Sequence, residues 1–481
     1  MTSPAERMSE ETGLWRDLGA IATAHVLMLR DVSVIDDPVL AAVLTALDGV
    51  SRGEAAHGEA IVDAVARFDA RVDALTPAGA VGTVSVGRGR ADTAATVVRL
   101  AARRDATALA AGAVTVRRTL IELAGRHAAT TMPAYIAGRP AQATTFGHYL
   151  GGVIAPFARA VARLHLALED IDRCPLGAVA LASTSLPVDR ERVAALLGFG
   201  GIADNTFDAV IAVDPLVAAA QAAAAIVTPI GRLVEEFRAW LRSDATSLGL
   251  DERWTGHEPG LPQMVLPVGL DRIAALAATV LAASAACERS AASITYEPPG
   301  YRLDDVARSC GLAMRTAQTV VEHLNAVVRD GLEINRAYLA NTAGRGHTTS
   351  SDLAIFLMEA EGLDPAAAAN IAAMTVNRAV AEGIEASGIT TQMIDASALM
   401  VIGREIAVEF EAISRYLAPR RFLERRTATG GPSPARTREY LGREERLLSS
   451  HVVWLLNVTD RIRNATTERE RLVRETITDA S

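Results

Sequence analysis

The most informative absence in this sequence is lysine, because all 48 basic residues among its 481 are arginine. Arginine stays protonated in proteins and forms no Schiff base. The composition therefore excludes pyridoxal-phosphate chemistry, Schiff-base aldolases, and the phosphate-binding lysines of P-loop proteins and kinases. A GC-rich coding bias and a functional selection would both produce this absence, and the sequence does not separate them.

Cysteine is also scarce, and acidic residues outnumber basic ones by 57 to 48. The three cysteines, Cys174, Cys287 and Cys310, lie far apart, which argues against a disulfide framework and against a C-x-x-C metal site. We therefore expect no metal and no cofactor. The net charge of −9 argues against a general nucleic-acid binder.

No targeting segment is evident either. The first residues are polar and acidic, unlike a signal peptide, and the longest apolar stretches are alanine-rich and interrupted by charge or proline. We expect a soluble cytoplasmic protein that binds neither nucleic acid nor membrane.

Strand signals are few, whereas alanine, leucine, glutamate and arginine, all strong helix formers, fill the long segments. Apolar residues recur there at spacings of three and four. The predicted helical segments are 97–127 (as one helix or two), 144–174, 207–244 (kinked at Pro215 and Pro229), 270–291 and 303–332. Loops are predicted at 175–177, 198–205, 256–269, 296–301 and 425–436. Helices that are apolar on several faces predict a bundle completed by other subunits.

The motifs along the chain resemble those of the argininosuccinate lyase family. PLGAVALASTSLPVDRERVAALLGF (175–199) is similar to the family's P-L-G-x-G-A-L-A-G-T-x-x-P-I-D-R-E pattern, and TTMPAYIAGRPAQATTFGHYL (130–150) to its T-x-M-P-G-Y-T-H-L-Q-R-A-Q-P pattern. The likeness spans about residues 20 to 470 in the right order. Further matching segments are GRGRAD (87–92), RLVEEFRAW (232–240), SSDLAIFLM (350–358) and RRTATGGPSP (425–434).

This resemblance implies the all-α fold of the fumarase/aspartase superfamily, with three domains and a central bundle of long helices. It also implies a homotetramer with active sites shared between subunits. We expect the domains to span residues 1–105, 106–349 and 350–481. Members of the superfamily eliminate fumarate from succinyl compounds. The carbanion formed there needs fixed positive or hydrogen-bonding groups around it.

The first active-site motif, G-R-S-R-N-D in the family, keeps Arg88, Arg90 and Asp92 but loses its serine and asparagine. Arginine binds carboxylates in a bidentate manner, so Arg90 is a candidate for holding an anionic group of the substrate. The alternative is a structural Arg–Asp pair at the start of a helix.

The second motif loses its catalytic histidine, which is replaced by Ala137. Alanine transfers no proton. Arg139 and Gln142 remain as substrate-binding candidates, and His148 as a catalytic candidate that could equally cap or pack in the bundle.

The third motif is the mobile loop, whose serine is the family's proposed base. If Thr255 anchors the match, His257 and Glu258 replace the serines; if Asp271 anchors it without a gap, Leu261 and Pro262 do. In both alignments the lysine and asparagine that hold the substrate carboxylate are missing. Histidine transfers protons near neutral pH without the activation that serine requires. The alternative is a solvated, disordered loop without a role.

A later family motif survives only as Tyr296, a further catalytic candidate, and the acidic pair Asp304 and Asp305.

Three functions are consistent with these motifs. The first is an enzyme repurposed for a small, anionic, non-standard substrate, by elimination, addition or cyclisation, in specialised biosynthesis. The second is a catalytically inactive relative that binds a partner or serves a structural role. The third is a carbon–nitrogen lyase that releases fumarate from argininosuccinate, which the three altered motifs disfavour.

Overall fold

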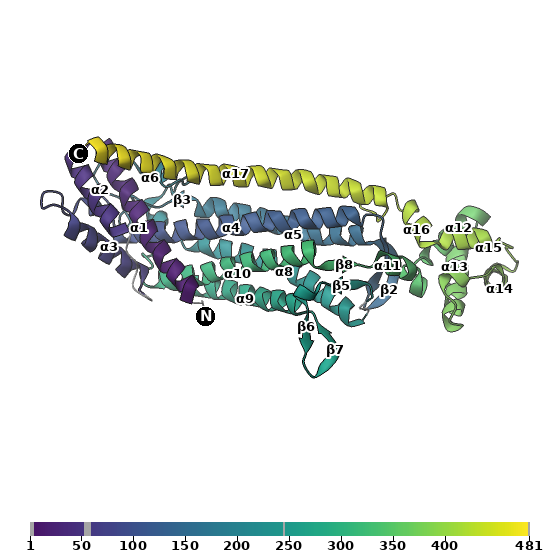
Figure 1. Ribbon diagram of the computed structural model, residues 1–481. Helices are drawn as coiled ribbons and strands as arrows, with labels where there is room; N and C mark the ends of the chain where they lie inside the picture. Colours follow the sequence, from purple (N-terminus) through teal and green to yellow (C-terminus); the bar gives the residue numbers. More distant parts are fainter. Residues whose placement is uncertain (1–3, 52–58, 244–245, 480–481) are drawn as a thin grey trace.

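The computed structural model describes residues 4–51, 59–243 and 246–479. Five long helices form a bundle, and the C-terminal helix α17 (Pro434–Asp479) runs along its side (Figure 1). The bundle helices are α4 (Arg90–Arg126), α5 (Phe146–Ile171), α8 (Asp214–Ser243), α9 (Val268–Ala291) and α10 (Arg302–Asp330). The all-α prediction is confirmed.

Helix α4 is a single helix of 37 residues, about 55 Å long, which decides between the two forms predicted for 97–127. Its small and apolar residues are buried along the whole length, so tertiary packing stabilises it. Helix α10 runs beside it in the same direction, because Arg315 pairs with Asp105 at 2.8 Å and Thr119 donates to Asn325 Oδ1 at 2.7 Å.

The segment predicted at 207–244 is two helices. Helix α7 (Thr206–Ile211) is capped by the Asn205 side chain and ends before α8 begins at Asp214. Pro215 lies in the first turn of α8, where its missing N–H costs nothing, and Pro229 lies inside α8 without ending it.

Smaller elements cover the two ends of the bundle (Figure 1). At one end lie α1 (Pro4–Asp31), α2 (Asp37–Ser51), α3 (Ile61–Leu75), η1 (Thr83–Ser85) and α6 (Arg190–Leu196). At the other end the chain forms α11 (Arg336–Thr342), η3 (Arg345–His347), α12 (Ser351–Glu361), α13 (Pro365–Ala381), η4 (Ala386–Gly388), α14 (Thr391–Ile402), α15 (Phe410–Leu417) and α16 (Pro419–Arg425). Helices α12 to α15 enclose an apolar core of their own, separate from that of the bundle.

The strands form four two-stranded sheets among the described residues. Their pairs are β1 (Thr131–Ile136) with β2 (Arg139–Thr145), β3 (Arg173–Cys174) with β4 (Gly201–Ile202), β5 (Leu248–Leu250) with β8 (Leu332–Ile334), and β6 (Gly256–Glu258) with β7 (Leu261–Leu266); η2 (Glu252–Trp254) precedes β6. The loop predicted at 256–269 is therefore a β-hairpin, and it projects from the bundle (Figure 1).

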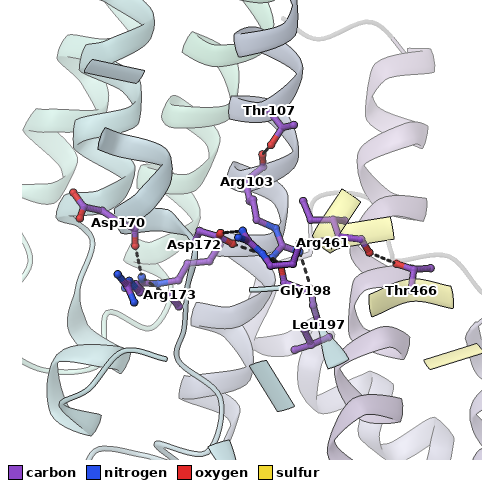
Figure 2. Close-up of polar contacts among 11 residues, drawn as sticks. Arg103, Thr107, Asp170, Asp172, Arg173, Leu197, Gly198, Arg461 and Thr466 are labelled. Atoms are coloured by element: carbon purple, nitrogen blue, oxygen red, sulfur yellow. Dashed lines mark hydrogen bonds and ion pairs between the residues drawn. The ribbon is translucent and has the colours of Figure 1, made fainter. Parts of the chain in front are cut away.

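A buried ionic cluster fastens α17 to the bundle (Figure 2). Asp172, just after α5, accepts from Arg103 of α4 at 3.1 Å and also pairs with Arg461 of α17. Arg103 donates further to the carbonyls of Gly198 and Leu197, at 2.8 and 2.9 Å. The donors of these guanidinium groups thus meet both a charge and carbonyls, which offsets the cost of burying them.

The division into three domains stays a prediction. Helix α4 continues through the expected boundary at 105, and α17 lies against the bundle although it was assigned to the C-terminal domain. Within the described ranges, α8 and α9 are long and apolar enough for a membrane span by length and composition alone. Helix α8 is mostly buried in the bundle, as expected of a core helix.

We predict that His25 makes folding acid-sensitive. Burial lowers the pKa of His25 to about 3, and the neighbouring Arg88 lowers it further against the hydrogen bond with the Val86 carbonyl. The unfolded chain takes up this proton below pH 6.5 and the folded chain does not. The free energy of unfolding therefore falls by ~2 kcal/mol between pH 7 and 5.

Urea unfolding at both pH values tests this contribution. His25→Gln keeps a donor for the Val86 carbonyl but does not titrate, so this variant should lose correspondingly less stability. Equal pH dependence in the two proteins contradicts the assignment.

Candidate active site

The first altered motif lies at the start of α4, where Asp92 is fully buried. Its carboxylate accepts the backbone N–H groups of Gly89, Gly177 and Val179 at 2.8–2.9 Å. Burial raises the pKa of Asp92 to about 6, while these hydrogen bonds and Arg88 oppose the rise. The carboxylate thus joins α4 to the segment that carries the 175–199 motif and is not exposed to solvent.

The two arginines of this motif lie in different surroundings. Arg88 is buried and pairs with Asp69 of α3, a partner that the sequence analysis missed, since Asp69 belongs to no family motif. The Nη1 of Arg88 and the Nδ1 of His25 are both buried without a hydrogen-bond partner among the described residues. Arg90 is exposed and makes no ion pair within the part of the chain described, so it is available to an anion.

The second motif forms the hairpin of β1 and β2, at the opposite end of α4. Its turn consists of Ala137 and Gly138, with φ of 50° and 74°. Positive φ at both turn residues matches a two-residue hairpin loop, and glycine adopts it without strain. Arg139 and Gln142 follow on β2, and both are exposed.

His148 lies in the first turn of α5, where both ring nitrogens are engaged. Its Nε2 donates to the carbonyl of Gly430 at 3.1 Å, and its Nδ1 accepts from the Thr144 hydroxyl at 2.9 Å. The ring thus holds the glycine-rich 425–434 segment against α5. The structure shows these two contacts of the His148 ring, and its catalytic role stays a prediction.

The third motif forms the hairpin of β6 and β7. His257 pairs with Val265 across the strands, Glu258 pairs with Leu261, and the register shifts between them. Both His257 and Glu258 are exposed, and neither makes an ion pair with a described residue. This segment is paired as a β-hairpin, and the role of its polar side chains stays a prediction.

Tyr296 lies between α9 and α10 and is 84% exposed. Asp304, from the same motif, accepts the backbone N–H of Ile61 at 3.0 Å and thereby holds α10 to α3. Tyr296 follows the end of α9 and the β6–β7 hairpin precedes its start. These 24 residues separate the two by about 36 Å.

The candidate residues therefore form two groups in one chain. Arg88, Arg90, Asp92 and Tyr296 lie at the end of the bundle near α3, whereas the two hairpins lie toward the other end. The structure brings no residue of one group to the other within a subunit. A site that uses both groups requires more than one copy of the chain.

Two C-terminal motif segments meet in a contact that the sequence did not predict. Asp352, 2% exposed, accepts from Arg426 at 2.7 and 3.0 Å and from Arg425 at 2.8 Å. Burial opposes ionisation, but the hydrogen bonds from both arginines hold the pKa of Asp352 below its usual range. Nearby, His347 contacts Ser350 at 3.2 Å, and its neighbour Gly346 lies against Pro140 of the first hairpin.

Sequence comparison finds lyases along most of the chain. The family described as "Lyase" matches residues 53–280. The argininosuccinate lyase of Methanoculleus marisnigri is 30% identical over 438 residues, which cover 90% of this chain and 87% of that protein. Argininosuccinate lyase 2 of Agrobacterium fabrum is 27% identical over 427 residues, covering 87% and 84%.

Solved structures show the same fold. EDDS lyase in complex with formate superposes with a TM-score of 0.83 at 24% identity, over 99% of this chain and 96% of that chain. A fumarate lyase from Mesorhizobium sp. BNC1 has a TM-score of 0.69 at 18% identity, over 91% and 97%. The fold is therefore that of the fumarase/aspartase lyases. Within them, this chain belongs to the argininosuccinate lyase family.

We predict that Asp92 contributes to stability and Arg90 does not. Asp92→Ala leaves three backbone N–H groups without their acceptor and should lower the free energy of unfolding by at least ~3 kcal/mol. Arg90→Ala, two residues away on the surface, should change it by less than ~0.5 kcal/mol. Chemical denaturation measures both, and equal stability of the two variants contradicts this placement of Asp92.

Proposed function

We propose that this protein is a lyase of its superfamily that acts on a small anionic substrate other than argininosuccinate. The observation that supports this most strongly is the turn of the first hairpin. Where the family carries its catalytic histidine, the turn holds Ala137 and Gly138, neither of which transfers a proton. The reaction is an elimination, addition or cyclisation in a specialised biosynthetic pathway.

In this proposal His257 is the acid/base group of the new reaction. It lies on a hairpin that can close over a bound substrate, and closure excludes water from the reacting atoms. The exposed Arg90 holds an anionic part of the substrate through paired hydrogen bonds. Glu258, Arg139 and Gln142 are exposed on the two hairpins and line the same site.

The placement of these residues supports a site shared between subunits of a homotetramer, which we propose to be cytoplasmic. His257 and Arg90 lie toward opposite ends of one bundle, so the hairpin acts on the α4 end of a neighbouring subunit. The names of the structural relatives, EDDS lyase and fumarate lyase, describe enzymes of carboxylate compounds. That chemistry favours an anionic substrate for this chain as well.

The first expected result concerns the inherited reaction. Loss of one transition-state donor costs roughly 10²–10³ in rate, and loss of acid–base help about 10²–10⁴. Starting from about 10 per second for a typical enzyme, turnover of argininosuccinate should stay below about 10⁻³ per second. Fumarate release followed by absorbance measures it, with the Methanoculleus marisnigri relative as positive control. Turnover near one per second would refute the proposal.

The second expected result concerns His257. Fumarate mixed with amines, and a panel of succinyl compounds, are screened by NMR for addition and elimination. With the substrate found, His257→Ala should lower turnover at least tenfold because the proton-transferring group is lost. Its assembly and melting temperature should stay unchanged.

Gln263→Ala is the matched control, since Gln263 is exposed on the opposite strand of the same hairpin. It should leave turnover unchanged. If His257→Ala keeps full turnover, His257 is not the acid/base group, and Tyr296 and His148 are tested next. If no compound is converted, the alternative of a binding or structural protein is favoured.

A further inference from the structure

Two of the three cysteines lie on neighbouring helices and face each other. Cys287 belongs to α9 and Cys310 to α10, and both are buried, with exposed fractions of 0% and 1%. Residues 292–301 connect the two helices, which lie side by side in the bundle (Figure 1). Their spacing along the sequence did not predict that these two thiols would meet.

The contacts of Cys287 define where it lies against α10. Its Sγ is 3.7 Å from the carbonyl oxygen of Val306, four residues before Cys310, and 3.9 Å from that of Leu216 at the start of α8. A helical side chain leans toward the N-terminus of its own helix. Because a short segment joins the end of α9 to the start of α10, the two helices run in opposite directions. Cys310 therefore leans toward the level of Val306, and Cys287 leans toward Cys310.

The two thiols are also hydrogen-bonded to each other. Donation by Cys310 to the Cys287 sulfur lowers the pKa of Cys287, against the effect of its burial, and raises the pKa of Cys310. The thiolate is the nucleophilic form of cysteine, so Cys287 is the more reactive of the two and Cys310 is placed to attack it in turn. Cys174 on β3 differs, because burial raises its pKa to about 12.

We infer that Cys287 and Cys310 form a reversible disulfide when the protein meets a hydroperoxide. Cys287 loses its proton and attacks one peroxide oxygen, so that an S–O bond forms, the O–O bond breaks and water leaves. Cys310 then attacks the Cys287 sulfur, an S–S bond forms, and the hydroxide leaves as a second water with the Cys310 proton. Two thiols are oxidised, and one hydrogen peroxide is reduced to two water molecules.

The position of the pair near helix ends gives a small oxidant access. Cys287 lies four residues before the end of α9, and Leu216 lies in the first turn of α8. Helix ends open at a fraction of the free energy of global unfolding. The connecting segment that follows α9 is mostly exposed and carries Tyr296.

The bond has a defined effect on the fold. It joins α9 to α10 covalently at one end of the bundle and closes the segment that carries Tyr296 into a loop. In a reducing compartment such a bond is transient and responds to oxidants, so cellular thiols reverse it. This inference depends on the thiol pair alone and not on the reaction catalysed.

Peptide mapping of the full-length wild-type chain tests this inference without any substitution. The protein is treated with excess hydrogen peroxide, its free thiols are alkylated in denaturant, and its peptides are analysed without reduction. The free thiols should fall from three to one, with Cys287 linked to Cys310 and Cys174 alkylated. Dithiothreitol should restore all three thiols.

Two variants, both checked for helix content by circular dichroism, separate the roles of the cysteines. Cys174→Ala is the matched control and should still lose both of its remaining thiols to one disulfide. Cys310→Ala removes the attacking thiol, so Cys287 should remain a sulfenic acid that dimedone traps.

Three results on the wild-type chain overturn the inference. The first is three free thiols after peroxide treatment. The second is a disulfide that includes Cys174. The third is oxidation of Cys287 to a sulfinic acid without a bond to Cys310.

Discussion

The length of α4 is the constraint from which the rest of this molecule follows. Its 37 residues hold the first motif and the second motif about 55 Å apart, and the helices packed along it keep that distance fixed. No local rearrangement brings the two ends together. A site that used both motifs would therefore need more than one copy of the chain. Within one chain, stability depends largely on contacts that hold the helices side by side.

Ion pairs of arginine side chains hold these helices together. Arg103 and Arg461 meet at Asp172, and Arg117 pairs with Glu444 of α17 at 2.6 Å. A guanidinium carries five donors in a rigid plane, so one side chain can satisfy a carboxylate and carbonyls together. An ammonium group would present three donors on a flexible stem. The arginines of this lysine-free chain can therefore form buried contacts between helices. The chain has no side-chain amine for Schiff-base chemistry.

The helices and the family were predictable from the sequence, because they depend on patterns that repeat over twenty or more residues. The long segments at 144–174, 270–291 and 303–332 correspond closely to α5, α9 and α10. The two hairpins were not predicted: β6 and β7 lie in a stretch rich in glycine and proline that reads as a loop. The site residues were named from motifs, but a motif does not say what a side chain contacts. Asp92 accepts hydrogen bonds from backbone N–H groups, and His148 contacts the Gly430 carbonyl. These contacts are seen only in the folded chain.

The ion pairs at Asp352 affect where the sequence of this protein can vary during evolution. The chain enters the small unit of α12 to α15 beside Asp352 and leaves it beside Arg425 and Arg426, and these side chains bind one another. The unit has its own apolar core, and it also meets the rest of the chain where the backbone N–H of Gly346 donates to Glu385 at 3.0 Å, so it resembles an insertion attached near its two ends. Its outer helices can be lengthened, shortened or exchanged while Asp352 in α12 stays paired with Arg425 and Arg426 at the end of α16. Diversity among relatives should therefore accumulate there, at little cost to the bundle that carries the site.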